Sequence, residues 1–421
     1  MKLLHCADIH LGYETHGRLD PATGLNSRLL DFRRSFDVMV ARAIDEGIDA
    51  FVFAGDAYRT ADPTPTQQKL FAEALRPLAE ASIPVLMVVG NHDHPVSFGK
   101  ASSVDIFGVL GDGVKVYRTP TRDTVETRSG PLRVIAMPWP IRSLILSKDE
   151  HRGKSPHEIR AFIEERYADF IRSAAEEARR DFADVPVVMV GHFSVQGAEL
   201  SGSERASLIA HEPKWSVGQL AQPGIDYVAL GHIHRYQDRN REAYERGDGP
   251  PVVYSSSIER ISFKEHDADK GFVLVDIEPR DGGGKTTRYT FVATPARRFV
   301  PIEADLTEAP DPTAALLAEI ARHDVADAVA RVRYRVGEEQ ATAVDVGAVR
   351  DALAAADTVA AIERVVDPGE RRRRTTVRRD TSLKDAVERY VAQHEPLAKL
   401  QDELVAAALE IEREVDAVGS P

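Results

Sequence analysis

The sequence is poor in cysteine and has no long apolar run. Its single cysteine, Cys6, excludes an intrachain disulfide and argues against a structural zinc site built on thiolates. It contains neither a signal-peptide pattern nor a run of about 18 apolar residues, so nothing in it indicates export or a membrane span. These absences favour a soluble protein of the reducing cytoplasm.

Positive charge is also scarce, with 54 Lys and Arg against 67 Asp and Glu and a formal net charge of -13. Such a charge disfavours general adhesion to DNA or acidic membranes, so any contact with nucleic acid has to be local. The sequence contains no internal repeat and no GxxxxGK[ST] phosphate loop. Its 421 residues, 43% hydrophobic and 29% charged, are typical of a globular protein of two or three domains.

The first two thirds of the chain alternates short apolar runs with helical patterns, which indicates an α/β fold with a sheet covered by helices. The predicted strands are Leu3–Ala7, Ala50–Ala54, Val85–Val89, Val134–Met137, Val187–Val190 and Tyr227–Leu230. The predicted helices are Ser27–Glu46, Thr66–Ala81 and Pro156–Arg180. Three later runs lack long intervening helices, so we expect antiparallel strands that close a second sheet: Val252–Tyr254, Phe272–Ile277 and Thr287–Val292.

Beyond Phe299 the pattern predicts a separate α+β unit of about 70 residues. Its strands and helices are expected, in chain order, at Val300–Ala304, Pro312–Arg322, Ala328–Val336, Val346–Ala355 and Val359–Val366. Pro368 and Gly369 end the unit. An arginine-rich stretch from Arg371 to Arg379 follows, which is either a solvated linker or a contact for nucleic acid.

Residues 382–416 are predicted to form a final helical segment with one apolar face. Ser382, followed three residues later by Asp385, is a capping signature, and Pro396 is expected to divide the segment in two. The apolar face has to be buried. It packs either on its own chain or, as its position beyond the linker favours, on a partner helix.

Five short polar motifs each stand where an apolar run ends. They are Asp8-Ile9-His10, Gly55-Asp56, Gly90-Asn91-His92-Asp93, Gly191-His192 and Gly231-His232-Ile233-His234. Functional side chains in open α/β sheets gather beyond the carboxyl ends of the strands, so the five motifs are expected to converge. If strand geometry persists, residues two apart point to one side, and each Asp-x-His or His-x-His pair can hold one ion. The glycines in front of these residues should permit sharp turns and close approach to phosphate.

Seven of these side chains are candidate metal ligands: Asp8, His10, Asp56, Asn91, His192, His232 and His234. Their mixture of carboxylate, amide and imidazole suits Mn²⁺ or Fe²⁺, and a shared aspartate can bridge two ions. Two ions about 3.5 to 4 Å apart can bind phosphate oxygens, generate a hydroxide and stabilise the leaving oxygen. A lone histidine near a strand is more often a core residue, but five motifs together predict phosphoester hydrolysis.

These blocks resemble the calcineurin-like metallophosphoesterase superfamily and, within it, the SbcD-type DNA repair exonucleases. The narrower resemblance rests on the stretches 4–12, 53–56, 90–93, 254–257 and 270–272 and covers about residues 1–295. It implies a four-layer α-β-β-α sandwich followed by a small α+β capping domain and C-terminal helices. The domain boundaries it implies are 1–296 for the nuclease, 297–367 for the capping domain, 368–380 for a basic linker and 381–421 for an ATPase-binding segment.

The resemblance also implies a role for each motif residue. One metal would be held by Asp8, His10, Asp56 and His234, and the second by Asp56, Asn91, His192 and His232, with Asp56 as the bridge. His92 falls where the family positions the phosphate and protonates the departing oxygen, a role that histidine can fill at cytoplasmic pH. Asp93 either orients that ring or makes a structural hydrogen bond. His5, inside the first strand, is expected to be a core residue and not a ligand.

Two positions depart from the family's pattern. Arg59 stands three residues beyond Asp56, where the family often has His or Asp, and a fixed cation can clamp a phosphate but cannot shuttle a proton. Ser256 stands where the family usually has glycine, so a positive φ there would strain or rebuild the turn.

The function implied by the resemblance is a Mn²⁺-dependent nuclease subunit of an SbcCD-like DNA repair complex. Its activities would be exonuclease on double-stranded ends and endonuclease on single strands. The implied partners are DNA, a second copy of the chain and an SMC-like SbcC-type ATPase bound through residues 382–416. Two alternatives stay open. One is a small-molecule phosphodiesterase or phosphatase of the same superfamily, and the other is a scaffold that recruits the ATPase without cutting DNA.

Overall fold

The computed structural model describes residues 1–95, 99–109, 111, 113–141, 154–204, 212–281, 283–367, 382–392 and 395–418. It divides into two compact units. The first is formed by Met1–Ile302, His323–Val332 and Ala352–Ala361, and the second by Glu303–Arg322, Arg333–Asp351 and Ile362–Pro421. The predicted arginine-rich stretch, Arg371 to Arg379, lies outside the described residues.

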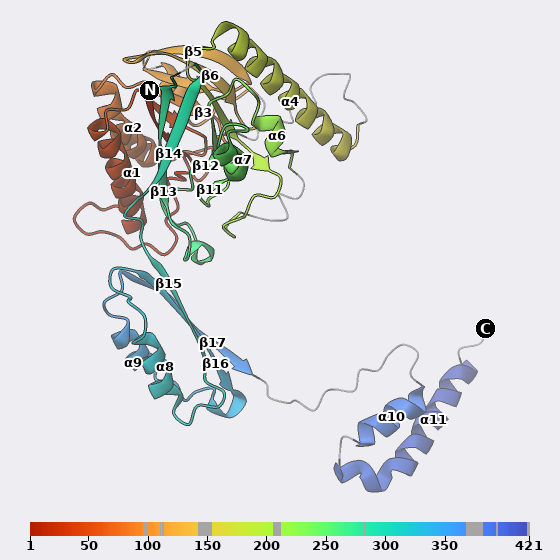
Figure 1. Cartoon of the computed structure of the whole chain (residues 1–421). Helices are drawn as coiled ribbons and strands as arrows, with labels where there is room; N and C mark the ends of the chain where they lie inside the picture. Colours follow the sequence, from red (N-terminus) through yellow and green to blue (C-terminus); the bar gives the residue numbers. More distant parts are fainter. Residues whose placement is uncertain are drawn as a thin grey trace. The chain divides into compact units, whose positions relative to one another are not determined.

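The first unit is built on two six-stranded sheets (Figure 1). The first sheet has the order β14-β13-β1-β2-β3-β4, with β14 (Lys285–Ala293), β13 (Gly271–Pro279), β1 (Lys2–Cys6), β2 (Ala50–Phe53), β3 (Val85–Val88) and β4 (Val114–Tyr117). The second has the order β11-β12-β10-β7-β6-β5, with β11 (Gln237–Asp238), β12 (Val252–Tyr254), β10 (Tyr227–Gly231), β7 (Val187–His192), β6 (Gly130–Met137) and β5 (Thr121–Thr127). The central strands of both sheets run parallel.

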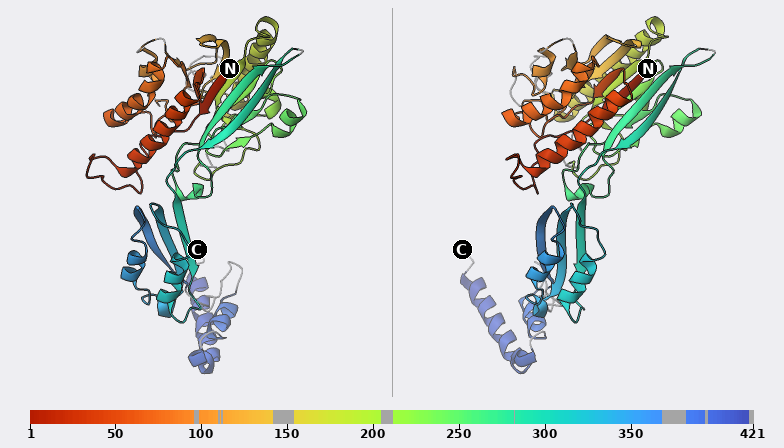
Figure 2. Two further views of the ribbon diagram at one scale, coloured as in Figure 1. Left: turned by 60° about the vertical axis from the view of Figure 1, so that its left-hand side comes forward. Right: turned by 90° about the vertical axis from the view of Figure 1, so that its left-hand side faces the viewer.

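Helices cover the outer face of each sheet. The long helices on these faces are α1 (Ser27–Asp45), α2 (Pro65–Glu80) and α4 (Pro156–Asp181). The unit also contains the shorter η1 (Asp105–Val109), α6 (Val217–Leu220), α7 (Arg241–Arg246) and η3 (Phe263–Glu265). Two short strands, β8 (Ser194–Val195) and β9 (Lys214–Trp215), form a separate pair. In Figures 1 and 2 the red and orange α1 and α2 lie on one outer face, and the olive α4 lies on the other.

Alternate residues of each central strand pack into different layers. In β1, Leu4 and Cys6 pack in one core with α1 and α2, whereas Leu3 packs between the two sheets. In β7, Met189 packs in a core with α4, whereas Val190 packs between the sheets. Because both faces of these strands are buried, the strands are continuous apolar runs. The four-layer α-β-β-α sandwich implied by the resemblance is confirmed.

The expected pairing of the later strands is wrong in two respects. β13 and β14 do not close a second sheet but extend the first one, with β13 antiparallel to β1 and Leu274 opposite Leu4. β12 joins the second sheet through parallel pairing with β10, and β10 continues that sheet into β7 and β6. The local pattern could not separate these pairings, because strands of both sheets are apolar and their partners lie far along the chain.

The three long helices agree with prediction to within one residue at each end, because their start signals are encoded locally. The Asn26 side chain accepts a hydrogen bond from Arg28 N at the start of α1. Thr64 with Gln67 and Ser155 with Glu158 form complete capping boxes for α2 and α4.

The chain beyond residue 298 follows the predicted α+β order. A three-stranded sheet has the order β15-β16-β17, and its elements are β15 (Phe299–Asp305), α8 (Pro312–Ile320), β16 (Val329–Gly337), η4 (Glu338–Gln340), α9 (Val346–Ala352) and β17 (Thr358–Asp367). The last elements are α10 (Leu383–Ala392), η5 (Glu395–Leu400) and α11 (Gln401–Val418), and Pro396 lies in η5, between the two helices as predicted. Among the described residues, no helix combines the length and apolar character needed to cross a bilayer.

Candidate metal centre

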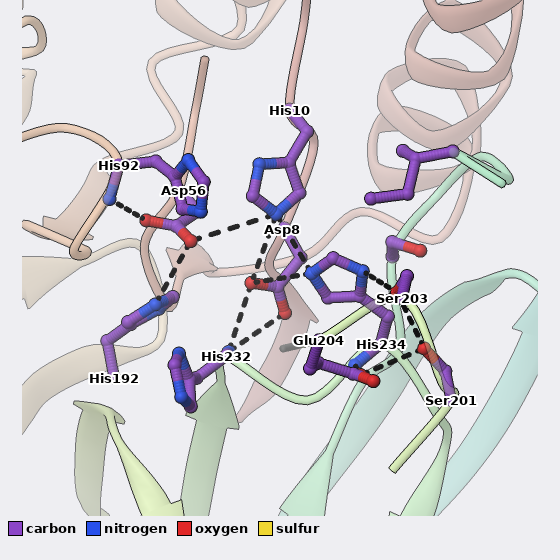
Figure 3. Close-up of polar contacts among 12 residues, drawn as sticks. Asp8, His10, Asp56, His92, His192, Ser201, Ser203, Glu204, His232 and His234 are labelled. Carbon is purple, nitrogen blue, oxygen red and sulfur yellow. Dashed lines mark hydrogen bonds and ion pairs between the residues drawn. The ribbon is translucent and has the colours of Figure 1, made fainter. Parts of the chain in front are cut away.

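The five polar motifs meet where central strands of the two sheets end. Asp8 N donates to the carbonyl of Gly55 at 2.9 Å, which joins the loops after β1 and β2. Across the sandwich, His232 N donates to both carboxylate oxygens of Asp8 at 3.0 Å. Figure 3 shows the side chains of Asp8, His10 and His234 pointing into the same space. The predicted convergence at the carboxyl ends of the strands is therefore present.

Backbone strain, and not continued strand geometry, aims these side chains. β1 ends at Cys6 and β10 at Gly231, before the motif residues begin. Asp8, His10 and Asp56 have φ values of 53°, 51° and 61°, and His232 has 94°. Non-glycine residues rarely adopt this region, and such strain concentrates at functional sites. The strand geometry on which the expectation depended therefore does not persist. Asp8 and His10 still face each other, with Oδ1 and Nε2 3.9 Å apart, whereas His232 faces Asn91 and His234 faces His10.

The first group of ligand atoms is formed by Asp8, His10 and His234. His10 Nε2 and His234 Nε2 lie 2.9 Å apart, and each lies 3.9 Å from Asp8 Oδ1. His234 Nδ1 donates to Glu265 Oε1 at 3.0 Å, so Nε2 is the nitrogen of His234 that faces the centre. All three side chains are buried.

The second group contains Asp56, Asn91, His192 and His232. Asn91 Oδ1 lies 2.9 Å from His192 Nε2 and 3.0 Å from His232 Nδ1, and His192 Nε2 lies 3.3 Å from Asp56 Oδ2. His192 Nδ1 donates to Ala54 O at 2.6 Å, and His232 Nε2 donates to Glu212 Oε2 at 3.0 Å. His192 Nε2 and His232 Nδ1 are therefore the ring nitrogens that face the centre and the amide oxygen of Asn91.

Asp56 lies between the two groups. Its Oδ2 is 3.7 Å from His10 Nε2 as well as 3.3 Å from His192 Nε2. Its Oδ1 accepts a hydrogen bond from His92 N at 2.8 Å. Burial opposes ionisation of this carboxyl, but the charges of His192 and His92 hold its pKa well below the usual range. Asp56 is thus placed to face ligands of both groups.

His92 lies at the edge of the same centre and is half-buried. Its Nδ1 donates to the carbonyl of Arg59 at 2.7 Å, and its ring is edge-on to His10, with centroids 4.8 Å apart. Because Nδ1 carries the donated hydrogen, Nε2 is the nitrogen left for exchange with a substrate.

Asp93 does not orient the His92 ring, and the structural alternative holds instead. Its buried carboxylate accepts hydrogen bonds from the backbone N of Asp56 at 2.8 Å, of Ala57 at 2.9 Å and of Gly90 at 3.0 Å. Burial and the charge of Asp56 raise the pKa of Asp93 to about 6. Asp93 fixes the loops that carry Asp56 and Asn91.

A supporting network behind His234 was not foreseen from the sequence. Glu265 accepts from His234 Nδ1 and pairs through Oε2 with the buried Lys270 Nζ at 3.0 Å. Lys270 Nζ also donates to His234 O at 2.9 Å and to Ser257 Oγ at 3.0 Å. Burial lowers the pKa of His234, but the Glu265 hydrogen bond and the Asp8 charge outweigh it and raise that pKa to about 9. Lys270 belongs to the stretch 270–272, one of those on which the family resemblance rests, whereas Glu265 and Glu212 belong to no motif.

The two departures from the family pattern are both accommodated. Arg59 offers its carbonyl to His92, while its guanidinium lies over the ring of Tyr13, 5.0 Å from the centroid. Ser256 has a φ of 75°, so the turn keeps the conformation that favours glycine and is strained, not rebuilt. The Ser256 hydroxyl lies 2.9 Å from His234 O, and this hydrogen bond ties the strained turn to a candidate ligand.

The glycines in the motifs serve close packing more than turning. Only Gly55 has a positive φ, 94°, and makes the sharp turn that was expected. At Gly90 an added Cβ would lie 2.1 Å from Asp56 Oδ1, and at Gly231 it would lie 2.1 Å from Ala54 O. These glycines therefore allow the strand ends and ligand loops to touch each other.

His5 is a core residue, as predicted. It is fully buried, with Nδ1 3.0 Å from the Tyr227 hydroxyl and Nε2 3.2 Å from Leu230 O. Burial lowers its pKa to about 3, although the hydrogen bond to Leu230 opposes the shift. A neutral ring held by the second sheet is not free to reach the centre.

The residues present fit divalent metal ions. Three groups have ligand atoms within 4.8 Å of one another: Asp8, His10 and His234; Asp8, Asp56 and His192; and His10, Asp56 and His92. Within the described part of the chain, the ion pairs of buried Asp8 and Asp56 are made with histidines only. The inward histidine nitrogens face oxygen atoms of Asp8, Asp56 and Asn91, and two acceptor atoms this close repel each other unless a proton or a cation lies between them. Oxygen and imidazole donors of this kind suit first-row divalent metals.

Comparisons with known proteins agree with this chemistry. The family model described as calcineurin-like phosphoesterase matches residues 1–236. The SbcD subunit of the nuclease SbcCD from Bacillus subtilis (strain 168) is 29% identical over 289 residues, which are 66% of this chain and 67% of that protein. The corresponding SbcD subunit from Escherichia coli (strain K12) is 25% identical over 263 residues, 61% of each chain.

An archaeal protein is similar over a longer stretch of this chain. The DNA double-strand break repair protein Mre11 of Archaeoglobus fulgidus is 24% identical over 323 residues, 72% of this chain and 62% of that protein. Matches to these three relatives thus span between 61% and 67% of the relatives' own lengths. They confirm the resemblance inferred from the motifs.

Proposed function

This chain belongs to the calcineurin-like phosphoesterase family. From that premise we propose that it is a DNA nuclease that hydrolyses phosphodiester bonds, and that it is the nuclease subunit of an SbcCD-like DNA repair complex. Its activities would be exonuclease on double-stranded ends and endonuclease on single-stranded DNA. The observation that carries the proposal is the buried centre in which Asp56 faces two groups of ligands, with His92 beside it. Relatives named nucleases support DNA as the substrate.

We assign two metal ions, with Mn²⁺ as the proposed metal, to the two groups of ligands. Asp8, His10, Asp56 and His234 would hold one ion, and Asp56, Asn91, His192 and His232 the other. The position of Asp56 Oδ2 between His10 and His192 supports Asp56 as the bridge. When bound, such ions neutralise phosphate charge, lower the pKa of water and stabilise the leaving oxygen.

His92 is proposed as the acid that protonates the departing sugar oxygen. The hydrogen bond from Nδ1 to Arg59 O leaves Nε2 to carry the transferred proton, and the hydrogen bond from His92 N to Asp56 Oδ1 fixes the loop beside the centre. A positioned histidine of this kind contributes about 10²- to 10⁴-fold to a rate.

The rest of the chain is proposed to supply further contacts with DNA and the contact with the ATPase. We assign residues 1–296 to the nuclease, 297–367 to a DNA-capping domain, 368–380 to a basic linker and 381–421 to binding of an SbcC-type ATPase in the cytoplasm. Exposed apolar side chains on α10 and α11, among them Tyr390, Leu404 and Ile411, support the last assignment, because a partner helix would bury them. We further propose that two copies of the chain act as a homodimer.

The direct test is DNA cleavage by the purified chain. With Mn²⁺, an end-labelled linear duplex should lose its label and a single-stranded circle should be cut, and a chelator should stop both reactions. His92→Ala should lower the rates about 10²- to 10⁴-fold. His94→Ala, two residues along and in contact with Pro95 O, is the matched control and should stay active.

The outcomes separate the alternatives. A chain that stays inactive on DNA even with an SbcC-type ATPase would overturn the proposal. Turnover of model phosphodiesters without cleavage of DNA would favour a small-molecule phosphodiesterase. Full complementation of a repair defect by His92→Ala would favour a scaffold.

A further inference from the structure

A tryptophan stands against the metal centre, and the proposed chemistry gives it no role. The Trp139 ring centroid lies 5.1 Å from that of His232, with the planes tilted by 39°, and 6.2 Å from that of His192, edge-on. Trp139 is partly exposed, whereas the other tryptophan of the chain, Trp215, is completely buried behind the second sheet. Trp139 is therefore partly accessible to solvent while its ring contacts two candidate ligands.

The backbone holds Trp139 firmly in this place. The residue follows the end of β6, and its N donates to Val89 O at 2.9 Å, which joins the second sheet to the loop that carries Asn91. Pro138 and Pro140 flank it, and their rings restrict the backbone. Pro138 O accepts a hydrogen bond from the Tyr167 hydroxyl at 3.2 Å, so α4 also supports the segment. The backbone that carries the indole is therefore held in place before any substrate arrives.

The chemistry at this rim suits a nucleobase and not a phosphate. His232, whose ring contacts that of Trp139, is itself hydrogen-bonded to the carboxylate of Glu212. The indole is uncharged and offers a π-face on which any of the four bases can stack. If the centre holds the scissile phosphate, the base of an adjacent nucleotide is one sugar away.

We propose that Trp139 is a nucleobase subsite on which the base next to the scissile phosphate stacks during cleavage. This inference rests on the proposed nuclease function, because the phosphate held at the centre sets where the base falls. A base on Trp139 has left its duplex stack, so the subsite favours single strands and DNA ends whose last pair has opened. Stacking on an aromatic side chain commonly strengthens binding by roughly 5- to 100-fold per base.

Intrinsic fluorescence tests the contact directly. The chain has only two tryptophans, and Trp139→Phe reports the buried Trp215 alone, so the difference between spectra isolates Trp139. In a His92→Ala background with Mn²⁺, single-stranded oligo(dT) should quench the Trp139 signal, and inorganic tripolyphosphate, which has no base, should not. Quenching by both ligands, or by neither, would overturn the proposal.

Kinetics on abasic DNA separate stacking from mere support of His232. Trp139→Ala should raise KM for a single-stranded oligonucleotide roughly 5- to 100-fold, and Trp139→Phe should restore most of the affinity. The penalty should shrink when an abasic site replaces the base on one side of the scissile phosphate. An equal penalty on abasic and normal DNA, together with weaker Mn²⁺ binding in a calorimetric titration, would show that Trp139 only supports His232. A wild-type chain that cuts no DNA at all would instead overturn the nuclease function.

Discussion

Glu265 and Lys270 form a buried ion pair directly behind His234, with both side chains essentially inaccessible to solvent. A buried pair of this kind adds little net stability while intact, but removing one partner leaves an uncompensated charge in the interior. The pair also fixes the tautomer and the direction of His234, because Glu265 takes the Nδ1 hydrogen. The main effect of the ion pair is therefore to orient His234, a candidate metal ligand.

Glu265→Gln keeps the shape of the side chain and removes its charge. We expect the free energy of unfolding to fall by about 3 to 5 kcal/mol, since Lys270 loses its counter-ion. Affinity for Mn²⁺ should fall about 10- to 100-fold, as for other hydrogen-bond partners of ligating histidines. Urea unfolding and isothermal titration with Mn²⁺ measure the two effects.

The double variant Glu265→Gln, Lys270→Met provides the control. It removes both charges, so part of the lost stability should return while Mn²⁺ affinity stays low. Unchanged Mn²⁺ affinity in Glu265→Gln would mean that Glu265 has no part in orienting His234.

His5 makes stability depend on pH in a predictable direction. Burial holds its folded-state pKa at about 3, below the value of about 6.5 for an unfolded chain. The unfolded chain therefore takes up the proton first, and the contribution of His5, complete above pH 6.5, is lost as the pH falls from 6.5 towards 3. Between pH 7 and pH 5 this loss amounts to about 2 kcal/mol.

His5→Asn removes the titrating group, so the difference in unfolding free energy between pH 7 and pH 5 should shrink by about 2 kcal/mol. Urea unfolding at both pH values measures it. His157→Asn, at an exposed position of α4, is the control and should keep the wild-type difference. If His5→Asn loses as much stability as wild type on acidification, His5 does not titrate as described.

At the scale of elements, the glycines that end the strands decide whether the two sheets can meet. A Cβ on Gly231, at the end of β10, would lie 2.1 Å from Ala54 O and 2.8 Å from Ala7 Cβ. Both contacts belong to strand ends of the first sheet, one of them on the backbone. The approach of β10 to β1 and β2 therefore requires glycine here.

Gly231→Ala should push these strand ends apart. We expect a loss of about 1 to 3 kcal/mol in unfolding free energy from overpacking. Mn²⁺ binding should weaken as well, because His232 moves away from Asp8. Thermal denaturation with and without Mn²⁺ tests both effects.

Gly218→Ala is the matched control, because Gly218 lies in α6 and its added Cβ would meet nothing within 4 Å. It should be neutral or about 1 kcal/mol more stable, since alanine favours a helix. A Gly231→Ala protein as stable as Gly218→Ala would contradict the packing argument.

The elements also show which features a sequence reveals. Caps such as Thr64 with Gln67 are local, so helix boundaries could be predicted, and ligands such as Asp56 could be found because they end apolar runs. The pairing of β13 with β1 could not be predicted, because backbone hydrogen bonds alone join residues more than 260 positions apart in the sequence. Glu265 and Trp139 escaped for a related reason. Their roles depend on contacts made only in the folded chain, and no spacing or neighbouring motif in the sequence indicates those contacts.

At the scale of the whole molecule, the described C-terminal helices are notable for uncovered apolar side chains. Leu404 and Ile411 of α11 are 37% and 60% exposed, and they stand seven positions apart, which places them on one side of the helix. Such a side is consistent with the helix-in-groove mode of partner binding.

Leu404→Glu combined with Ile411→Glu should abolish co-purification with an SbcC-type ATPase. Because both positions are exposed, each change should alter the free energy of unfolding by no more than about 0.5 kcal/mol. Ala406→Glu adds the same charge to the opposite side of α11 and should leave the complex intact. Undiminished co-purification of the double variant would place the ATPase contact elsewhere.

The centre also draws its ligands from strand ends far apart in the sequence, with His10 and His234 separated by 224 positions yet 2.9 Å apart. During translation at about 5 to 20 residues per second, the ribosome would add His234 roughly 10 to 45 s after His10. A nascent chain that ends before His234 would hold only part of the ligand set. If the chain is the proposed nuclease, such a copy could not yet cleave DNA.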